Sequence, residues 1–302
     1  MKRDFSIDGL RGLAIILMVS ANLAAVILIQ PHPLWFRFLS SCAAPIFTFL
    51  AGAMVAKTMA EKKYPFSYYL RRGLILIGIG ALIDVLVWQT LPFVSVDVLY
   101  FIGLSLPICA LSGRSKWVAV GVVAALTPIA QRYFGYADYS LDWGLDIRHW
   151  LVDGFFPILP WLIFPLLGAL TWNLSVVRRR AAASICLVVG GILWTMFPGE
   201  MAVRDGYSEL FYPPTLGFCL TMIGLIFALR EWKLFPPGFV FFGAHSLTVY
   251  VVHCVIIRYL WHPLFHNVSF ISFAGVFVAT LGLLAITVFS KRRIQAMMGK
   301  IL

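Results

Sequence analysis

Long hydrophobic stretches follow one another along the chain, and the short polar connectors between them alternate in charge. Connectors on one side are basic, and those on the other carry acids such as Asp142 and Glu200. Cytoplasmic loops of membrane proteins accumulate Lys and Arg, so the alternation counts and orients membrane spans. It predicts ten spans with both termini in the cytoplasm. The basic clusters are Lys2 to Arg3, Lys57 to Arg72, Arg114 to Lys116, Arg178 to Arg180, Arg230 to Lys233, and Lys291 to Lys300.

The pattern predicts an all-α polytopic membrane protein with a single transmembrane domain, residues 1–302. Apolar runs such as 13–29 and 272–289 approach the roughly 17–25 residues that cross a bilayer as a helix. Helices are required because unpaired backbone groups are costly in hydrocarbon. We expect the spans at 8–29, 38–60, 71–90, 95–111, 115–132, 153–175, 181–197, 213–229, 237–260 and 270–290.

Composition excludes several other classes of protein. With 61% hydrophobic and 12% charged residues, the chain has too little polar surface for a water-soluble globule. The net charge of +11 could indicate nucleic-acid binding, but the cations form small groups that suit anionic membrane lipid instead. The five cysteines show neither zinc spacing nor a disulfide framework, so we expect no metal site.

Polar residues within the first span form a stripe that is unusual in a membrane helix. Arg11 and Asn22 are eleven residues apart, which is three helical turns, and therefore share one face. Asp8 lies near the same line. The stripe predicts a route from the cytoplasmic entrance toward the outer half of the membrane. Asp8 and Arg11 could equally form a structural pair that caps the helix near the headgroups.

Two histidines lie toward the external side of the predicted protein. His253 shares a face of the ninth span with Ser246 and Tyr250, although a lone helix histidine is often only a packing residue. His32 lies in the external turn 30–35 between two prolines that restrict the backbone. Because it follows Asn22 by ten residues, we expect His32 to meet whatever the polar stripe conducts.

The third, fourth and sixth spans hold further candidates. Arg71 and Arg72 open the third span and suit a phosphorylated ligand, since guanidinium groups bind phosphate oxygens bidentately, although plain membrane anchoring is the alternative. Asp84 and Asp97 are polar intrusions for which helix pairing and a proton route are both open. The prolines around Trp161 predict a bent sixth helix that opens toward the outside.

Several motifs together resemble the heparan-α-glucosaminide N-acetyltransferase family and its bacterial relatives, within the wider group of transmembrane acyltransferases. Asn22 stands where the wider group usually has histidine, and His32 falls where the heparan-type branch keeps its proposed catalytic histidine. Ser41 and Cys42 replace the acidic residue usual before the second-span proline, and His245 stands where asparagine is common. The matching stretches are residues 3–22, 44–52, 71–78, 96–103, 157–168, 211–216 and 243–253.

The resemblance implies an acyltransferase of the bacterial cytoplasmic (inner) membrane that takes acetyl-CoA, or another acyl-CoA, as co-substrate. Arg71 and Arg72 would hold the phosphates, and Asp8 and Arg11 would line the pantetheine arm. Asn22 would donate to the thioester carbonyl and His32 would be the general base or the acylated nucleophile, with His253 in reserve. The acceptor, expected to be an extracytoplasmic glycan or small molecule, would contact Ser246, Tyr250, Asp97 and Trp161.

A transporter or flippase is the alternative reading, because kinked helices and intramembrane polar groups also describe carriers. No internal repeat supports it, since the polar residues of the first five spans lack counterparts in the last five. The oligomeric state, monomer or homo-oligomer, is open, as is the choice between O- and N-acylation.

Overall fold

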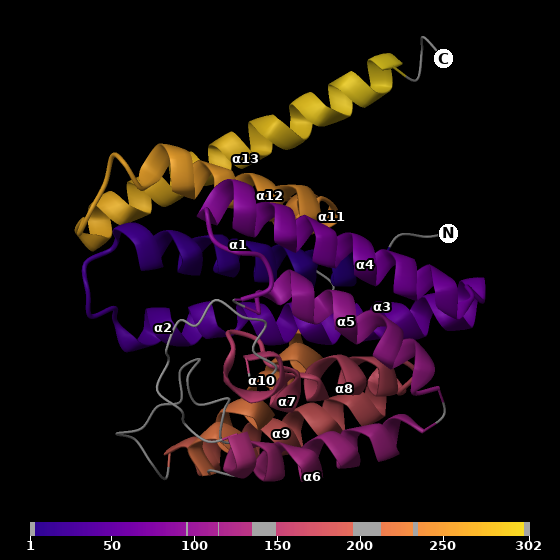
Figure 1. The fold of residues 1–302 in the computed structure, drawn as a ribbon. Helices are drawn as coiled ribbons and strands as arrows, with labels where there is room; N and C mark the ends of the chain where they lie inside the picture. Colours follow the sequence, from indigo (N-terminus) through magenta and orange to yellow (C-terminus); the bar gives the residue numbers. More distant parts are fainter. Residues whose placement is uncertain are drawn as a thin grey trace. The chain divides into compact units, whose positions relative to one another are not determined.

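The computed structural model describes residues 4–94, 96–113, 115–134, 149–195, 213–231 and 235–298, and regular structure there is helical apart from one isolated bridge between Leu28 and Val268 (Figure 1). The helices are α1 (Phe5–Ile27), α2 (Leu34–Ser41), α3 (Ala43–Lys62), α4 (Phe66–Ile83), the π-helix η1 (Asp84–Trp88), α5 (Val98–Leu111), α6 (Lys116–Phe134), the π-helix η2 (His149–Asp153), α7 (Ile158–Trp161), α8 (Ile163–Thr171), α9 (Val176–Thr195), α10 (Pro213–Arg230), α11 (Pro237–Ala244), α12 (Ser246–Ile256), the π-helix η4 (Ile257–Trp261) and α13 (Phe270–Met298).

Each predicted apolar segment coincides with a helix or a broken run of helices, so the all-α class is confirmed. Within the described residues, three helices are long and apolar enough to cross a membrane: Phe5–Ile27, Trp35–Lys62 and Phe270–Lys291. The bent pair Pro237–Ala244 and Ser246–Trp261 would make a fourth. Four further apolar helices have only 10–17 residues, short of the roughly 20 that a bilayer requires: Val98–Leu111, Trp117–Ala130, Ile158–Thr171 and Leu220–Arg230. Ten spans and their orientation therefore stay a prediction.

The chain divides into two compact units. Unit 1 comprises residues 1–43 and 232–302, and unit 2 comprises residues 44–231. Unit 1 thus joins the first helices of the chain to its last ones, whereas unit 2 is continuous in sequence. The prediction of a single domain is not tested by this division.

In unit 1, α1 and α11 approach each other closely because glycines face the contact. A Cβ atom on Gly12 would lie 1.7 Å from the carbonyl oxygen of Phe239, and one on Gly243 would lie 1.8 Å from that of Asp8. Neither position has room for a larger residue. Gly12 of α1 and Gly243 of α11 therefore set the distance between the two helices.

The far end of α1 is held by a hydrophobic cluster that also belongs to unit 1. Leu23 and Ile27 of α1 pack there with Phe36 of α2, Ile257 of η4 and Phe273 of α13. Such packing of several helices around apolar side chains is what keeps the end of α1 and the following loop in place.

In unit 2, α3 and α8 also meet through glycines. A Cβ atom on Gly52 would lie 1.8 Å from the carbonyl oxygen of Pro165, and one on Gly168 would lie 2.0 Å from that of Phe49. The two backbones are therefore in direct contact. This contact fixes which residues lie side by side at the next turns of both helices.

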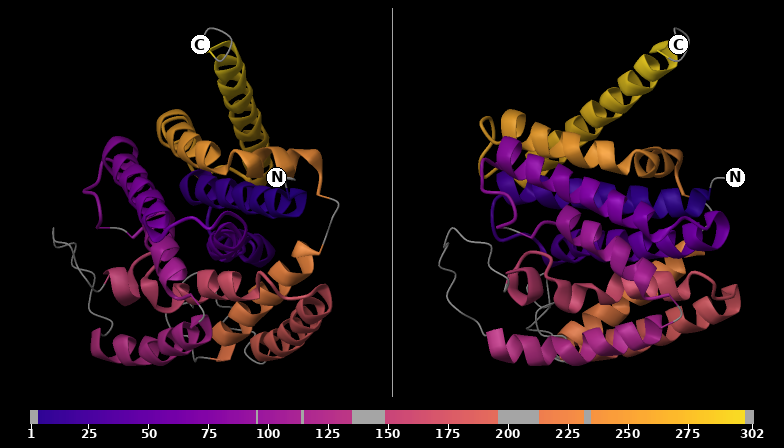
Figure 2. Two further views of the ribbon diagram at one scale, coloured as in Figure 1. Left: turned by 90° about the vertical axis from the view of Figure 1, so that its right-hand side faces the viewer. Right: turned by 45° about the vertical axis from the view of Figure 1, so that its right-hand side comes forward.

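Two breaks divide the sixth and ninth helical segments. The predicted bend near Trp161 is confirmed: α7 ends there, α8 begins at Ile163, and Leu159 has non-helical φ and ψ angles. The ninth segment was expected to be one helix, but α11 and α12 meet at His245 at an angle of 86° (Figure 2). No proline marks the bend at His245, so the sequence pattern did not indicate it.

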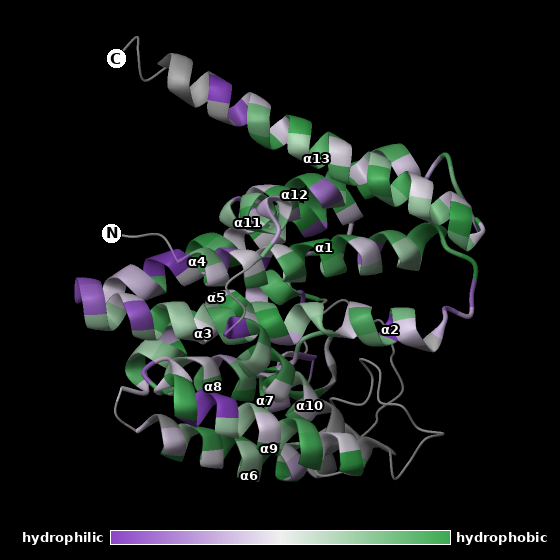
Figure 3. Ribbon diagram, turned by 180° about the vertical axis from the view of Figure 1, so that it is seen from behind, coloured by the Kyte–Doolittle hydropathy of each residue, from purple (hydrophilic) through white to green (hydrophobic). Residues whose placement is uncertain are grey.

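The outer surfaces of the helices are largely apolar. Ile271, Val278 and Ile286 on α13 are 86%, 67% and 63% exposed. Hydrophilic residues of α13 gather toward its C-terminal end instead (Figure 3). Large aliphatic side chains that face outward along helices are expected of a protein solvated by lipid.

Candidate functional site

Two of the predicted catalytic residues meet inside unit 1. The side-chain amide nitrogen of Asn22, on α1, lies 3.0 Å from Nε2 of His253, on α12. His253 is fully buried, whereas Asn22 is half-buried. The two residues are 231 positions apart in the sequence, so the packing of α1 against α12 creates the pair.

The hydrogen bonds of His253 define the state of its ring. Its Nδ1 is bonded to the backbone carbonyl oxygen of Tyr250, one turn earlier in α12. A carbonyl oxygen can only accept, so Nδ1 carries the proton, and Nε2 of the neutral ring accepts from the amide of Asn22. The imidazole is therefore oriented from both sides, and it in turn orients the amide group.

The other residues of the predicted α12 stripe lie on the same helix. Tyr250 is buried and its ring packs edge-on against the His253 ring, with 5.3 Å between ring centres. Ser246 is the first residue of α12 and is half-buried. These positions agree with the expected stripe, while a role in acceptor binding stays a prediction.

His32 is placed apart from this pair. Its Nε2 lies 2.9 Å from the amide nitrogen of Gln30, and its ring contacts Phe36 edge-on at 5.8 Å. Phe36 belongs to the hydrophobic cluster that begins at Leu23, the residue after Asn22. His32 and Asn22 thus border the same cluster, but the polar partner of Asn22 is His253.

The first polar residues of α1 are already paired. Arg11 donates to the carboxylate of Asp8 at 3.3 Å, and Asp8 is buried. This is the structural pair that the sequence offered as an alternative to a role along the pantetheine arm. The pair does not exclude ligand contact, since the Arg11 side chain remains 24% exposed.

The remaining predicted residues belong to unit 2. Arg71 and Arg72 are exposed near the start of α4, where Arg72 donates to the hydroxyl of Tyr68 at 2.7 Å. Asp97 caps the first turn of α5 by accepting from the backbone N–H of Val98 at 2.6 Å, which is a structural role. Trp161 is buried against Phe101, Phe156 and Phe164.

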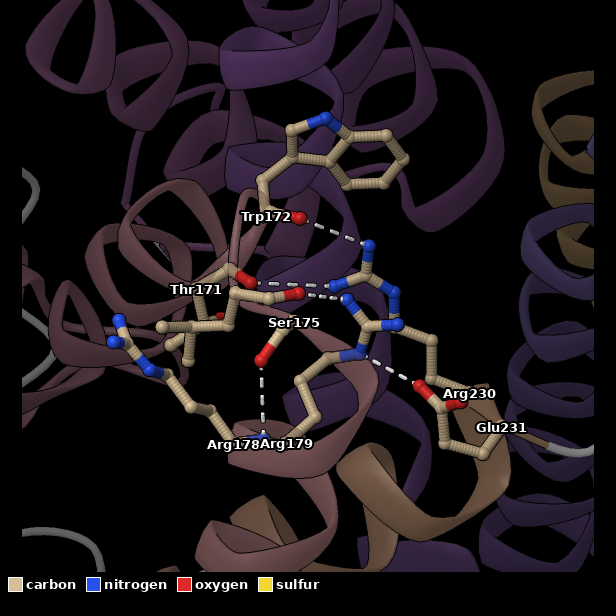
Figure 4. Close-up of polar contacts among 8 residues, drawn as sticks. Thr171, Trp172, Ser175, Arg178, Arg179, Arg230 and Glu231 are labelled. Atoms are coloured by element: carbon tan, nitrogen blue, oxygen red, sulfur yellow. Dashed lines mark hydrogen bonds and ion pairs between the residues drawn. The ribbon is translucent and has the colours of Figure 1, made fainter.

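A second group of charged residues in unit 2 was interpreted in the sequence only as membrane anchors. Arg230 donates to the backbone carbonyls of Thr171 and Trp172 at 3.5 and 3.2 Å, at the end of α8 (Figure 4). Arg179 binds the carboxylate of Glu231 at 2.6 Å. Lys57 of α3 also lies over the ring of Trp172. Three of the basic clusters predicted to face the cytoplasm, those of Lys57, Arg179 and Arg230, therefore contribute to one end of this unit.

The described residues include no group of three or more His, Cys, Asp and Glu side chains that could hold a metal ion. Their buried cysteines, Cys42, Cys109 and Cys254, are free thiols. The polar chemistry gathered in this part of the chain is that of an amide, an imidazole and several cations.

Comparison with known proteins identifies the family but no individual relative. No curated protein matches the chain. The family model of the heparan-alpha-glucosaminide N-acetyltransferase catalytic domain matches residues 3–195, which include α1, the His32 turn and the helices of unit 2 as far as α9. Enzymes of this type are membrane acetyltransferases that take acetyl-CoA as donor. The chain belongs to the heparan-alpha-glucosaminide N-acetyltransferase catalytic family.

Proposed function

We propose that this protein is an integral-membrane acyltransferase that moves an acetyl group from cytoplasmic acetyl-CoA to a hydroxyl or amine of an extracytoplasmic acceptor, a sugar of the cell envelope. The observation that carries the proposal is the hydrogen-bonded pair of Asn22 and His253. Asn22 lies on α1, the helix that opens the family match, and His253 lies on α12, beyond the matched residues. A half-buried, hydrogen-bonded amide whose partner is a fixed imidazole is suited to stabilising charge in a reaction.

The proposed reaction is a single transfer at the thioester carbonyl. His32 removes the proton of the acceptor hydroxyl or amine, whose oxygen or nitrogen attacks the carbonyl carbon. The C–S bond breaks, CoA leaves as the thiolate, and the proton held by His32 neutralises it. Acylation of His32 itself, followed by transfer to the acceptor, is the two-step version of the same exchange.

Asn22 has the role of a hydrogen-bond donor to the thioester oxygen, on which negative charge develops. Its amide has two N–H groups, and one of them is directed at Nε2 of His253. His253 is then a positioning residue, because it fixes the plane of the amide and so directs the second N–H. The apolar cluster beside the pair limits access of water to the thioester.

The proposal is tested with purified protein in sealed vesicles, with radiolabelled acetyl-CoA supplied on the cytoplasmic face only. We expect label to appear on a sugar acceptor inside the vesicle, together with free CoA outside. Uptake of an unmodified solute without CoA release would show a carrier, and absence of both CoA binding and thioester cleavage would refute the enzyme. Acetyl-CoA supplied only on the acceptor side should give no transfer.

A further inference from the structure

Lys57 on α3 is a buried cation for which the described part of the chain supplies no anion. The residue is 7% exposed, and its Nζ lies 5.3 Å from the ring centre of Trp172. No carboxylate oxygen of the described residues lies within 4.0 Å of this nitrogen, and none of their polar atoms accepts a hydrogen bond from it. An ammonium group has three donors, and burying it without acceptors is costly.

The fold forces Lys57 into this position. Gly52 and Gly168 bring α3 and α8 into backbone contact, as described above. Lys57 follows Gly52 by five residues and Trp172 follows Gly168 by four, so both lie about one turn beyond the contact. The backbone of Lys57 is therefore held near that of Trp172.

A second cation shares the same indole ring. The guanidinium carbon of Arg230 lies 4.5 Å from the ring centre of Trp172. The nearby carboxylate of Glu231 is engaged by Arg179, and Arg178 points away from the ring (Figure 4). Two like charges beside one ring repel each other, and a negative group between them would remove the repulsion.

Cation–π attraction alone does not account for the burial of Lys57. Its contribution is smaller than the free energy that burial of an ammonium group costs. The partial negative charge at the end of α8 already interacts with Arg230, because the carbonyls of Thr171 and Trp172 accept hydrogen bonds from that residue. The burial of Lys57 therefore calls for a further negatively charged partner.

We propose that Lys57 and Arg230 bind a phosphate group of the acyl donor at Trp172. This inference rests on the proposed function and names two residues of the donor site beyond Arg71 and Arg72. A phosphate supplies several acceptor oxygens and more than one negative charge, which suits two adjacent cations better than a carboxylate does. The start of α4 adjoins this end of α3, because Thr58, next to Lys57, is hydrogen-bonded to Tyr69 at 2.9 Å.

The test compares CoA with pantetheine, which lacks the phosphates, by titration of the full chain in nanodiscs of phosphatidylcholine. We expect Lys57→Met to weaken CoA binding at least about tenfold, because a charge-assisted hydrogen bond is lost. Pantetheine binding should be unchanged, and the melting temperature should not fall, because an apolar side chain suits the buried position. Lys57→Arg should retain most of the CoA affinity.

Arg178→Gln is the matched control, since it removes one positive charge from the same end but lies outside the cluster. Equal weakening by Arg178→Gln and Lys57→Met, or unchanged CoA affinity in Lys57→Met, would overturn the inference. A lipid headgroup would be the ligand if nanodiscs that contain equal parts of phosphatidylglycerol and phosphatidylcholine raise the melting temperature of the wild type but not of Lys57→Met, while both proteins bind CoA equally. That result would also overturn the inference. Failure of the wild-type protein to bind CoA would instead refute the proposed function.

Discussion

Two hydrogen-bonded pairs link helices, one pair in each unit, and they differ in how far they are buried. In unit 1, Asn22 of α1 is bonded to His253 of α12 at 3.0 Å. In unit 2, the hydroxyl of Tyr100 on α5 donates to the carboxyl group of Asp84 on η1 at 2.5 Å. Both pairs join two helices through one side-chain contact.

The pair in unit 2 is buried and covered by neighbouring side chains. Asp84 and Tyr100 are 2% and 0% exposed. The Tyr100 hydroxyl also accepts from the backbone N–H of Phe93 at 3.4 Å, and the rings of Phe93 and Trp150 pack against it. Trp150 donates to the carbonyl of Phe93 at 3.1 Å, which closes the loop over the pair.

The pair in unit 1 keeps one partly exposed member. Asn22 is half-buried, and within the described residues its amide makes a hydrogen bond to His253 alone. A partly exposed pair with spare donor capacity can bind a substrate atom, whereas a pair sealed from its surroundings is out of reach of one. The comparison therefore supports the chemistry proposed for Asn22 and favours helix pairing for Asp84, for which the sequence had left helix pairing and a proton route open.

The largest effect is expected at His32, which lies outside both pairs. His32→Ala should lower acyl transfer by about 10²–10⁴, because the acceptor loses its base, and by more if the ring is itself acylated. CoA binding and the melting temperature should stay near wild type, since the ring contributes only an edge contact with Phe36 and an exposed hydrogen bond with Gln30. Radiolabelled transfer, CoA titration and thermal unfolding measure the three quantities.

His262→Ala is a suitable control, because this histidine is exposed and shares unit 1 with His32. Near-normal transfer by His32→Ala, combined with an inactive His253→Ala, would move the base to α12. The comparison between the two pairs would still hold, but His253 would then be the base and Asn22 would orient its ring.

The next effect tests whether Asn22 and His253 act as one unit. Asn22→Ala should lower kcat by about 10²–10³, as expected for loss of a donor to a developing oxyanion. If His253 acts only by holding Asn22, the double variant with His253→Ala should be no slower than Asn22→Ala alone. His253→Gln should retain part of the activity, because its side-chain oxygen can accept from the amide.

Multiplicative losses in the double variant would show that His253 acts independently of Asn22. An inactive His253→Gln beside an active Asn22→Ala would point the same way. Thermal unfolding of each variant separates these outcomes from a loss of folded protein, since removing a fully buried imidazole also leaves a cavity.

The sequence predicted the helices well because long apolar runs leave few alternatives in a membrane. It also selected Asn22 and His253, since each is a polar residue in an apolar helix. Their pairing was not predicted: Asn22 was expected to act with His32, which is near it in the chain. Pairing depends on how α1 packs against α12, and the 86° bend at His245 that directs α12 has no proline to signal it.

The burial of Lys57, on which the proposed anion site rests, could not be predicted from the sequence either. Charge pattern alone assigned Lys57 to a lipid-facing cluster, and that pattern is identical for an exposed and a buried lysine. Burial follows from the contact of Gly52 with Pro165 and of Gly168 with Phe49, which joins helices that are far apart in sequence. The sequence gives only a weak signal of this burial: Gly52 lies five positions before Lys57, and Gly168 lies four positions before Trp172.

The smallest effect is expected at the sealed pair. Tyr100→Phe removes the hydroxyl and leaves the buried Asp84 without its donor, so the free energy of unfolding should fall by about 1–3 kcal/mol. Transfer by the protein that remains folded should be unchanged, because neither residue is proposed to contact a substrate. Tyr259→Phe, at an exposed tyrosine of η4, should change stability by less than about 0.5 kcal/mol. A large loss of kcat in Tyr100→Phe at wild-type stability would contradict the comparison, since it would give Asp84 the proton-transfer role that its closed surroundings argue against.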